Sequence, residues 1–164
     1  MQIPRMKLGS AFFCLYVALT GCASVSSNSS AMSGSCSSSA ESHRDTVLSF
    51  YREGLIGRQP RSAFERYTSP NFIEHKPDIQ GGTREATIVY LEQLIKDVPD
   101  PRWEVLRTAS DGDLVFLHAR FTPAAGAPAY AVADVFRLEN CLIVEHWDVV
   151  AAPREQQPNP RSRF

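Results

Sequence analysis

The stretch ADVFRLENCLIVEHWDVV, residues 133–150, is the most informative part of this chain for its fold. Two runs rich in β-branched and aromatic residues flank a short polar segment at 139–140, which is the pattern of a β-hairpin. The second run is interrupted by three ionisable residues, Glu145, His146 and Asp148. A buried charge is unfavourable unless it is paired or used. The stretch therefore predicts an antiparallel sheet and candidate functional side chains on its last strand.

The segments before this hairpin divide into helices and strands. Residues 102–110 and 114–123 are further strands, joined by the turn Asp-Gly-Asp. Helical spacing of apolar residues predicts three earlier helices, at residues 42–57, 61–69 and 83–99. Residues 71–82 contain Pro and Gly without a period, so we expect a loop there. Helices followed by an antiparallel meander predict the α+β class, with helices packed on one face of a curved sheet.

The first 21 residues predict a secretory leader. Arg5 and Lys7 precede a short apolar run at 11–19. That run is too short to span a bilayer roughly 30 Å thick, which needs about 20 apolar residues. The tetrad LTGC that ends at Cys22 resembles the bacterial lipobox, which implies a lipid anchor on Cys22. We expect a cell-envelope lipoprotein on the periplasmic side of the outer membrane; the alternative is an ordinary secreted protein.

The mature chain is expected to contain one domain, at residues 41–153. Residues 22–40 are mostly Ser and small residues, which predicts a flexible tether, and the Pro-rich residues 154–164 predict a disordered tail. The net charge of −1, with acids and bases interspersed, argues against a nucleic-acid partner. No Cys-x-x-Cys or His-x-His motif suggests a metal site. A bridge between Cys36 and Cys141 is compatible with an oxidising compartment.

Side-chain alternation along the expected strands gathers polar groups on one apolar face. A concave apolar face with a few converging polar groups is typical of a small-molecule pocket. A histidine on a strand can also be an ordinary packed residue, and Asp134 could instead make a contact that stabilises the fold. Trp147 falls on the opposite face, where we expect it to pack. The side chains expected on the pocket face are Phe116, His118, Asp134, Phe136, His146 and Asp148.

Three segments together resemble the SnoaL-like family, in order and in spacing. RYTSPNFIEHKPDIQGG (66–82) is similar to its Y-x-Q-H-N-P…G segment, and ASDGDLVFLHARF (109–121) is similar to its A-D-G-D-L-V-x-x-H hairpin. The stretch at 133–150 is similar to its x-D-x-F-R…K-I-x-E-H-W-D ending. The family belongs to the nuclear transport factor 2-like superfamily. The resemblance implies a cone-shaped curved antiparallel sheet with about three N-terminal helices that close a cavity.

The resemblance also implies a type of chemistry. The best understood members are polyketide cyclases that close a ring by intramolecular aldol condensation, without metal or cofactor. This reaction needs a base that removes a proton next to a carbonyl, and a donor that stabilises the enolate. By segment matching, Asp134 and His118 would be the catalytic pair. The expected cavity and substrate contacts are His75, His146, Asp148, Phe116 and Phe136. An isomerase or dehydratase, and a non-catalytic ligand-binding or accessory envelope lipoprotein, are the alternatives.

The chain departs from the family pattern at the expected cavity mouth. Glu74 and Lys76 stand where the family usually has Gln and Asn, so two opposite charges replace two amides. Members of the superfamily often dimerise through the outer face of the sheet, which implies a homodimer with Glu145 and Trp147 near the interface. We therefore expect a small molecule in the cavity, a lipid anchor and a second copy of the chain as partners.

Overall fold

The computed structural model describes residues 38–156, 158–159 and 161–164. The predicted leader, the lipidation site Cys22 and the tether up to residue 37 lie outside these residues. Within the described part of the chain, no helix is both long enough and apolar enough to cross a membrane.

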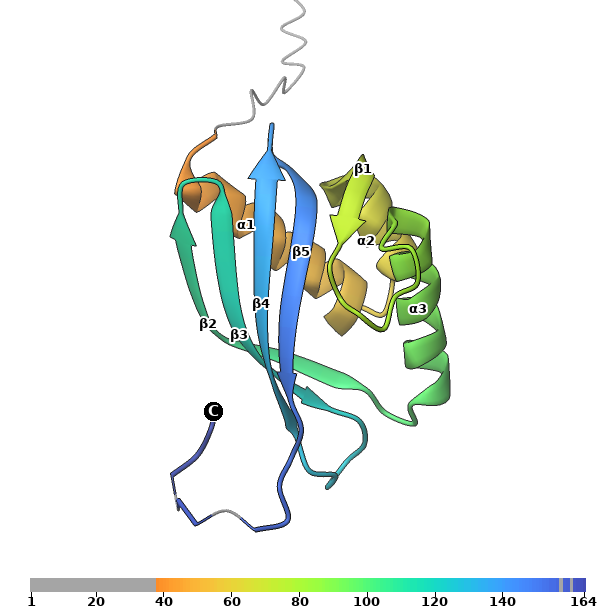
Figure 1. The fold of residues 1–164 in the computed structure, drawn as a ribbon, viewed down its shortest axis with the longest axis vertical. Coiled ribbons are helices and arrows are strands. Elements are labelled where there is room, and N and C mark those ends of the chain that lie inside the picture. The colour runs from red at the N-terminus through yellow and green to blue at the C-terminus, as the bar shows by residue number, and fades with distance from the viewer. Residues whose placement is uncertain (1–37, 157, 160) are drawn as a thin grey trace, which may run out of the picture. The chain divides into compact units, whose positions relative to one another are not determined.

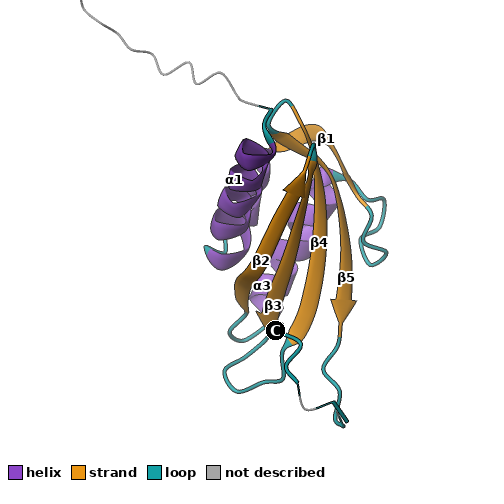
Figure 2. Cartoon of the chain, turned by 90° about the vertical axis from the view of Figure 1, so that its left-hand side faces the viewer, coloured by secondary structure: helices purple, strands orange, loops and turns teal. Residues whose placement is uncertain are grey.

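The predicted α+β class and cone-like fold are confirmed, with β1 inserted between the second and third α-helices and the other strands after them. The sheet order is β1-β5-β4-β3-β2, antiparallel from β2 to β5, with β1 parallel to β5. Figures 1 and 2 show a curved, unclosed sheet with the helices on one side. The elements are α1 (Ala40–Tyr51), η1 (Arg52–Ile56), α2 (Pro60–Tyr67), β1 (Thr68–Glu74), α3 (Arg84–Asp97), β2 (Arg102–Asp111), β3 (Leu114–Thr122), β4 (Tyr130–Glu139) and β5 (Leu142–Ala151).

Two of the helices, α1 and α3, begin at side-chain caps. The Ser39 hydroxyl accepts a hydrogen bond from the Ser42 N–H at 3.2 Å, so α1 starts two residues before the predicted position. The Thr83 hydroxyl accepts from the Ala86 N–H at 3.2 Å and caps α3, at the position where the sequence predicted the start of a helix. Such caps satisfy backbone N–H groups that have no partner within the helix. They therefore fix the first residue of each of these two helices.

Part of the segment predicted as a loop is a strand. Residues 68–74 form β1, which pairs in parallel with β5, and only the following residues up to the start of α3 form a loop. Within β1, Phe72 and Glu74 are buried while Ile73 between them is half exposed. Pro70 and the charged end of the strand hid this alternation in the sequence. Because a parallel partner is distant along the chain, no hairpin turn signals it.

The turn between β4 and β5 uses two residues with positive φ, Asn140 at 49° and Cys141 at 60°. Two-residue hairpin loops of type I′ require this geometry because it matches the twist of the flanking strands. The hairpin predicted at this point is therefore present. Cys141 is disulfide-bonded, and Cys36, its predicted partner, lies outside the described residues.

The hydrophobic core lies between the helices and the concave face of the sheet. Phe64 of α2 is at its centre, with ring centroids 5.0 Å from Phe50 and 5.4 Å from Phe72 in edge-to-face packing. Val115 and Leu117 of β3 are buried against the same layer. Edge-to-face pairs at these distances add to the stabilisation that comes from burying the rings. The core residues Phe50, Phe64 and Phe72 also form part of the wall of a cavity.

Candidate functional site

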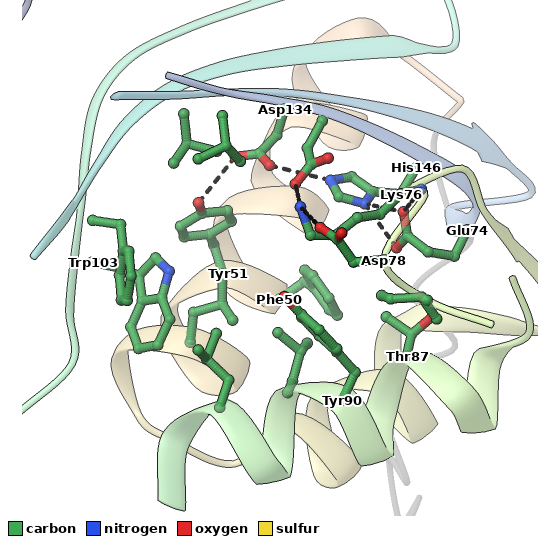
Figure 3. A pocket seen from close by; sticks show the side chains of 18 of the residues that line it. Phe50, Tyr51, Glu74, Lys76, Asp78, Thr87, Tyr90, Trp103, Asp134 and His146 are labelled. Carbon is green, nitrogen blue, oxygen red and sulfur yellow. Dashed lines mark hydrogen bonds and ion pairs between the residues drawn. The ribbon is translucent and has the colours of Figure 1, made fainter. Parts of the chain in front are cut away.

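A cavity of about 460 Å³ lies between the helices and the inner face of the sheet. Its volume falls within the range of small-molecule sites, about 300–1,000 Å³. Most of its wall is apolar, and Figure 3 shows side chains from helices and strands converging on it. Apolar residues from α1, η1, α3, β2 and β3 include Phe50, Leu55, Leu91, Leu94, Trp103 and Phe121.

The polar residues of the cavity come mainly from three strands and one loop. Asp134 of β4 lies directly opposite Asp148 of β5 in the strand register. Glu74 of β1 lies opposite His146 of β5 in the parallel register. Residues directly opposite on neighbouring strands have Cβ atoms about 4.5–5.5 Å apart. Sheet pairing therefore gathers carboxylates with an imidazole, and Glu74 and His146 meet although they are 72 positions apart in the chain.

A continuous chain of hydrogen bonds links these groups (Figure 3). The Tyr51 hydroxyl donates to Oδ2 of Asp134 at 2.9 Å. Nε2 of His146 lies 3.2 Å from Oδ1 of Asp134, and Nδ1 lies 2.9 and 3.0 Å from the two carboxylate oxygens of Glu74. Each ring nitrogen thus faces a carboxylate. Only the doubly protonated imidazolium donates from both nitrogens.

The surroundings of the ring favour that charged form. Burial by itself would lower the pKa of His146, but the hydrogen bonds to Asp134 and Glu74 raise it to about 10. Burial also raises the pKa of Tyr51 well above its usual value, and the neighbouring Asp134 charge raises it further. At neutral pH, His146 is therefore a cation and Tyr51 a neutral hydrogen-bond donor.

Lys76 reaches the same wall from the loop after β1. Its Nζ lies 2.8 Å from Oδ2 of Asp148 and 3.4 Å from Oδ2 of Asp78. Burial works to lower the pKa of Lys76, yet the bond to Asp148 leaves that pKa raised, so the side chain is an ammonium. The loop approaches β1 closely: a Cβ on Gly82 would lie 2.5 Å from the Glu74 carbonyl oxygen. Only glycine fits at this contact.

Four residues named from the sequence line the cavity: Phe136, Asp134, His146 and Asp148. Their alternation within β4 and β5 matches the prediction. A bulge between β4 and β5 shifts the register at the start of β5, so Ile143 rather than Val144 is the fully buried residue there. The roles assigned to these side chains stay predictions.

The predicted pair of Asp134 with His118 is wrong. In the β3–β4 register Asp134 lies opposite Leu117, which is buried, whereas His118 lies opposite Ala133 on the outer face. Nδ1 of His118 is 2.9 Å from the Arg107 guanidinium and does not line the cavity. Phe116, predicted to contact substrate, shares the outer face and is 40% exposed. One face of β3 is wholly apolar and packs towards the helices, whereas the other also carries His118 and Arg120.

His75 is also outside the cavity. Its ring stacks on Trp147 with centroids 4.5 Å apart, and its Nε2 lies 3.3 Å from Oε1 of Glu145. Because Glu74 points inward at the end of β1, the next residue points outward. Trp147 therefore packs on the outer face, as predicted.

The predicted site residues did not include several polar residues that line the cavity, among them Tyr51, Asp78 and Tyr90, and Glu74 and Lys76 were placed only at its expected mouth. Glu74 carried a usable signal, because it follows Phe72 by two positions and would share its face in a strand. The expectation of a loop removed that signal. Tyr51 had only its position on an apolar helix face, and nothing in the sequence shows that its hydroxyl meets Asp134.

An open, curved sheet closed by helices over a cavity is the architecture of the nuclear transport factor 2-like class. Residues 47–146 match the model of the SnoaL-like domain, and this chain belongs to that family. No curated protein matches the chain.

Solved structures with the same fold are numerous but distant in sequence. AclR from Streptomyces galilaeus is 18% identical over 69% of this chain and 91% of its own, with a TM-score of 0.57. A protein from Jannaschia sp. CCS1, provisionally assigned as a SnoaL-like polyketide cyclase, is 22% identical over 66% of this chain and 84% of its own, with a TM-score of 0.55. An NTF2-like protein from Cytophaga hutchinsonii is 20% identical over 66% and 89%, with a TM-score of 0.55. At these identities, the likeness shows the fold.

Proposed function

We propose that this protein is a small cofactor-free enzyme that uses Asp134 and His146 for acid–base chemistry on a small carbonyl compound, of the aldol-condensation or cyclase type. The observation that carries the proposal is the buried Asp134 carboxylate, oriented by Tyr51 and His146 on the wall of a largely apolar cavity. Positioned carboxylates and imidazoles are the common acid–base groups of enzymes. The family membership supports the same reaction class.

In the proposed reaction, Asp134 is the base. Each of its oxygens accepts one hydrogen bond, and a carboxylate oxygen has two lone pairs, so accepting capacity remains. Asp134 takes a proton from the carbon next to a carbonyl, and the electron pair of that C–H bond forms an enolate. The enolate carbon attacks a second carbonyl of the same molecule, and the resulting alkoxide takes the proton back from Asp134, which restores the carboxylate. His146, as a cation, stabilises the negative charge that develops on oxygen.

Exchange of α-protons tests the first step without knowledge of the natural substrate. We expect the wild-type protein to accelerate deuterium incorporation at the α-carbon of a panel of uncharged cyclic monoketones in D₂O, followed by NMR. His146→Gln should slow this exchange by about 10²-fold or more, the lower bound of general acid–base effects. His118→Ala changes the outer face only and should keep the wild-type rate. If the folded wild-type protein accelerates no exchange, the alternative of a non-catalytic ligand-binding protein is favoured.

The charges of the cavity predict which ligands enter it. Four carboxylates, those of Glu74, Asp78, Asp134 and Asp148, face the cations Lys76 and His146. Two unit charges about 4 Å apart interact by ~1 kcal/mol in water and more at a protein surface, so an anionic ligand is repelled. We expect 2-naphthylmethanol to bind at least about tenfold more tightly than 2-naphthoate, a difference of ~1.4 kcal/mol, as measured by calorimetry. Equal affinities would contradict this assignment of ligand class.

The proposals about the location of the protein and its partners are based on the sequence and its family resemblance. We propose that the enzyme is an envelope lipoprotein anchored through Cys22, and that two copies associate through the outer face of the sheet near Glu145 and Trp147. In this arrangement the tether would hold the cavity-bearing domain near a membrane surface. Both statements stay predictions.

A further inference from the structure

Glu74 stands out among the cavity carboxylates because its side chain is only 2% exposed and both of its oxygens contact one imidazole. We propose that Glu74 is a positioning residue: it keeps His146 in one orientation and in its cationic state, so that Asp134 is the group that changes protonation in the reaction. This inference rests on the proposed function of the same site. It concerns a position where the family usually has an uncharged amide.

The geometry leaves the ring little freedom. Glu74 and His146 are direct partners in the parallel β1–β5 register, and the two oxygens lie 2.9 and 3.0 Å from Nδ1. Glu74 is itself held, because the Lys76 backbone N–H donates to its Oε1 at 2.9 Å. The face of the imidazole stacks on Phe136, with centroids 4.5 Å apart. A rotated ring would lose the contacts of both nitrogens.

The charged surroundings favour the cation from several directions. Two carboxylates contact the ring directly, Glu74 from β1 and Asp134 from β4. The ammonium of Lys76, whose positive charge would disfavour a second cation, is paired with Asp148 at 2.8 Å. The remaining titratable groups around the cavity are Asp78 of the loop, Tyr51 of α1, Tyr90 of α3 and Tyr130 of β4. An uncharged amide in place of Glu74 would leave His146 with one carboxylate contact instead of two.

In this arrangement Asp134 and His146 have different roles in the proposed reaction. An unperturbed histidine changes charge near pH 6.5 and could act as a base itself. With two carboxylate contacts, the pKa of His146 is about 10, so the ring stays charged throughout the neutral range. Asp134 therefore remains as the base, and the imidazolium supplies fixed positive charge beside it. Glu74 acts through its contact with His146, whose charge it maintains, and not on the substrate.

The shift also predicts how stability depends on pH. The pKa of His146 is raised from about 6.5 in the unfolded chain to about 10 in the folded one. A group of this kind stabilises the fold fully below pH 6.5, and the contribution is lost as pH rises towards 10. In Glu74→Gln, the contribution of His146 should be smaller and should end at a lower pH. The contributions of the other groups that titrate in this range are common to both proteins, so they cancel when the two stability curves are subtracted.

NMR of the His146 ring tests the inference directly. In the wild-type protein, the ring ¹³C and ¹⁵N shifts should remain those of an imidazolium from pH 5 to 8. In Glu74→Gln, the midpoint should fall by at least about one pH unit, a tenfold weaker hold on the proton. Glu74→Asp keeps the charge and should restore part of the shift. Glu145→Gln removes a carboxylate from the outer face, beside His75, and should leave the His146 midpoint unchanged.

The pH profile of α-proton exchange separates the two proposals. If the inference is right, Glu74→Gln alters the pH dependence of exchange, and the change has the midpoint that NMR reports for His146 in that variant. A His146 midpoint equal in wild type and Glu74→Gln, with both proteins folded by circular dichroism, overturns the positioning role. If the midpoint shifts but the wild-type protein exchanges no protons, Glu74 still sets the charge of His146, and the proposed enzymatic function is the part that is wrong.

Discussion

Asp134→Asn should reduce the rate of enzyme-catalysed α-proton exchange by about 10²–10⁴-fold, the range of general acid–base catalysis. The amide has nearly the same shape as the carboxylate and still offers one acceptor, but it does not take up a proton at neutral pH. Glu74 remains in contact with His146, so the cavity should keep its form. Exchange of an uncharged cyclic monoketone, measured by NMR at constant pH, gives the rate.

The control for this variant is Asp113→Asn. Asp113 is an exposed carboxylate in the turn between β2 and β3, so the same chemical change occurs outside the cavity. Its exchange rate should equal that of the wild-type protein. An Asp134→Asn variant that is folded and exchanges protons within about twofold of wild type would remove Asp134 from the proposed mechanism, because loss of a general base costs at least about 10²-fold.

Phe64→Ala should lower the free energy of unfolding by about 3–5 kcal/mol, the usual cost of removing a fully buried aromatic side chain. Phe64 is 2% exposed and packs edge-to-face on Phe50 and Phe72. The ring also contributes to the cavity wall, so its loss removes packing on α1, on β1 and at the site. Urea unfolding followed by circular dichroism measures the change.

Phe116→Ala is the matched comparison. The same truncation on the outer face of β3 should change stability by only about 0.5 kcal/mol, as is usual for surface substitutions, because Phe116 is 40% exposed. If Phe116→Ala destabilised the protein as much as Phe64→Ala, the outer face would be covered in solution. That result would favour the proposed homodimer, because an interface between two copies would cover Phe116, which is 40% exposed in the single chain.

Most elements of the fold could be predicted from local patterns. The three helices carry apolar residues at helical spacing, and strands β2 to β5 are connected by turns with recognisable residues such as Asp-Gly-Asp. β1 could not be predicted in this way. Its partner β5 lies about 70 residues later, and the hydrogen bonds that make it a strand come from that distant segment, such as His75 N–H to the His146 carbonyl at 3.0 Å.

The candidate site was predicted only in part, because alternation places side chains on a common face within one strand but does not say which face lies inside. Asp134 falls with Phe136, and His146 with Asp148, because successive Cβ atoms in a strand point to opposite sides. For β3 the same alternation was read correctly, but the wrong side was chosen. The face with Val115 and Leu117 is wholly apolar, whereas the other face also carries His118 and Arg120, so the sequence held a signal that the prediction did not use.

Local sequence thus determines the helices, the antiparallel meander and which polar residues share one face of a given strand, since each of these depends on neighbours a few positions apart. The packing of the helices decides which face of the sheet encloses the cavity. The parallel pairing of β1 with β5 decides that His146 meets Glu74, and the placement of α1 brings Tyr51 to Asp134. These contacts join residues between 72 and 83 positions apart, so they exist only once the whole domain has folded.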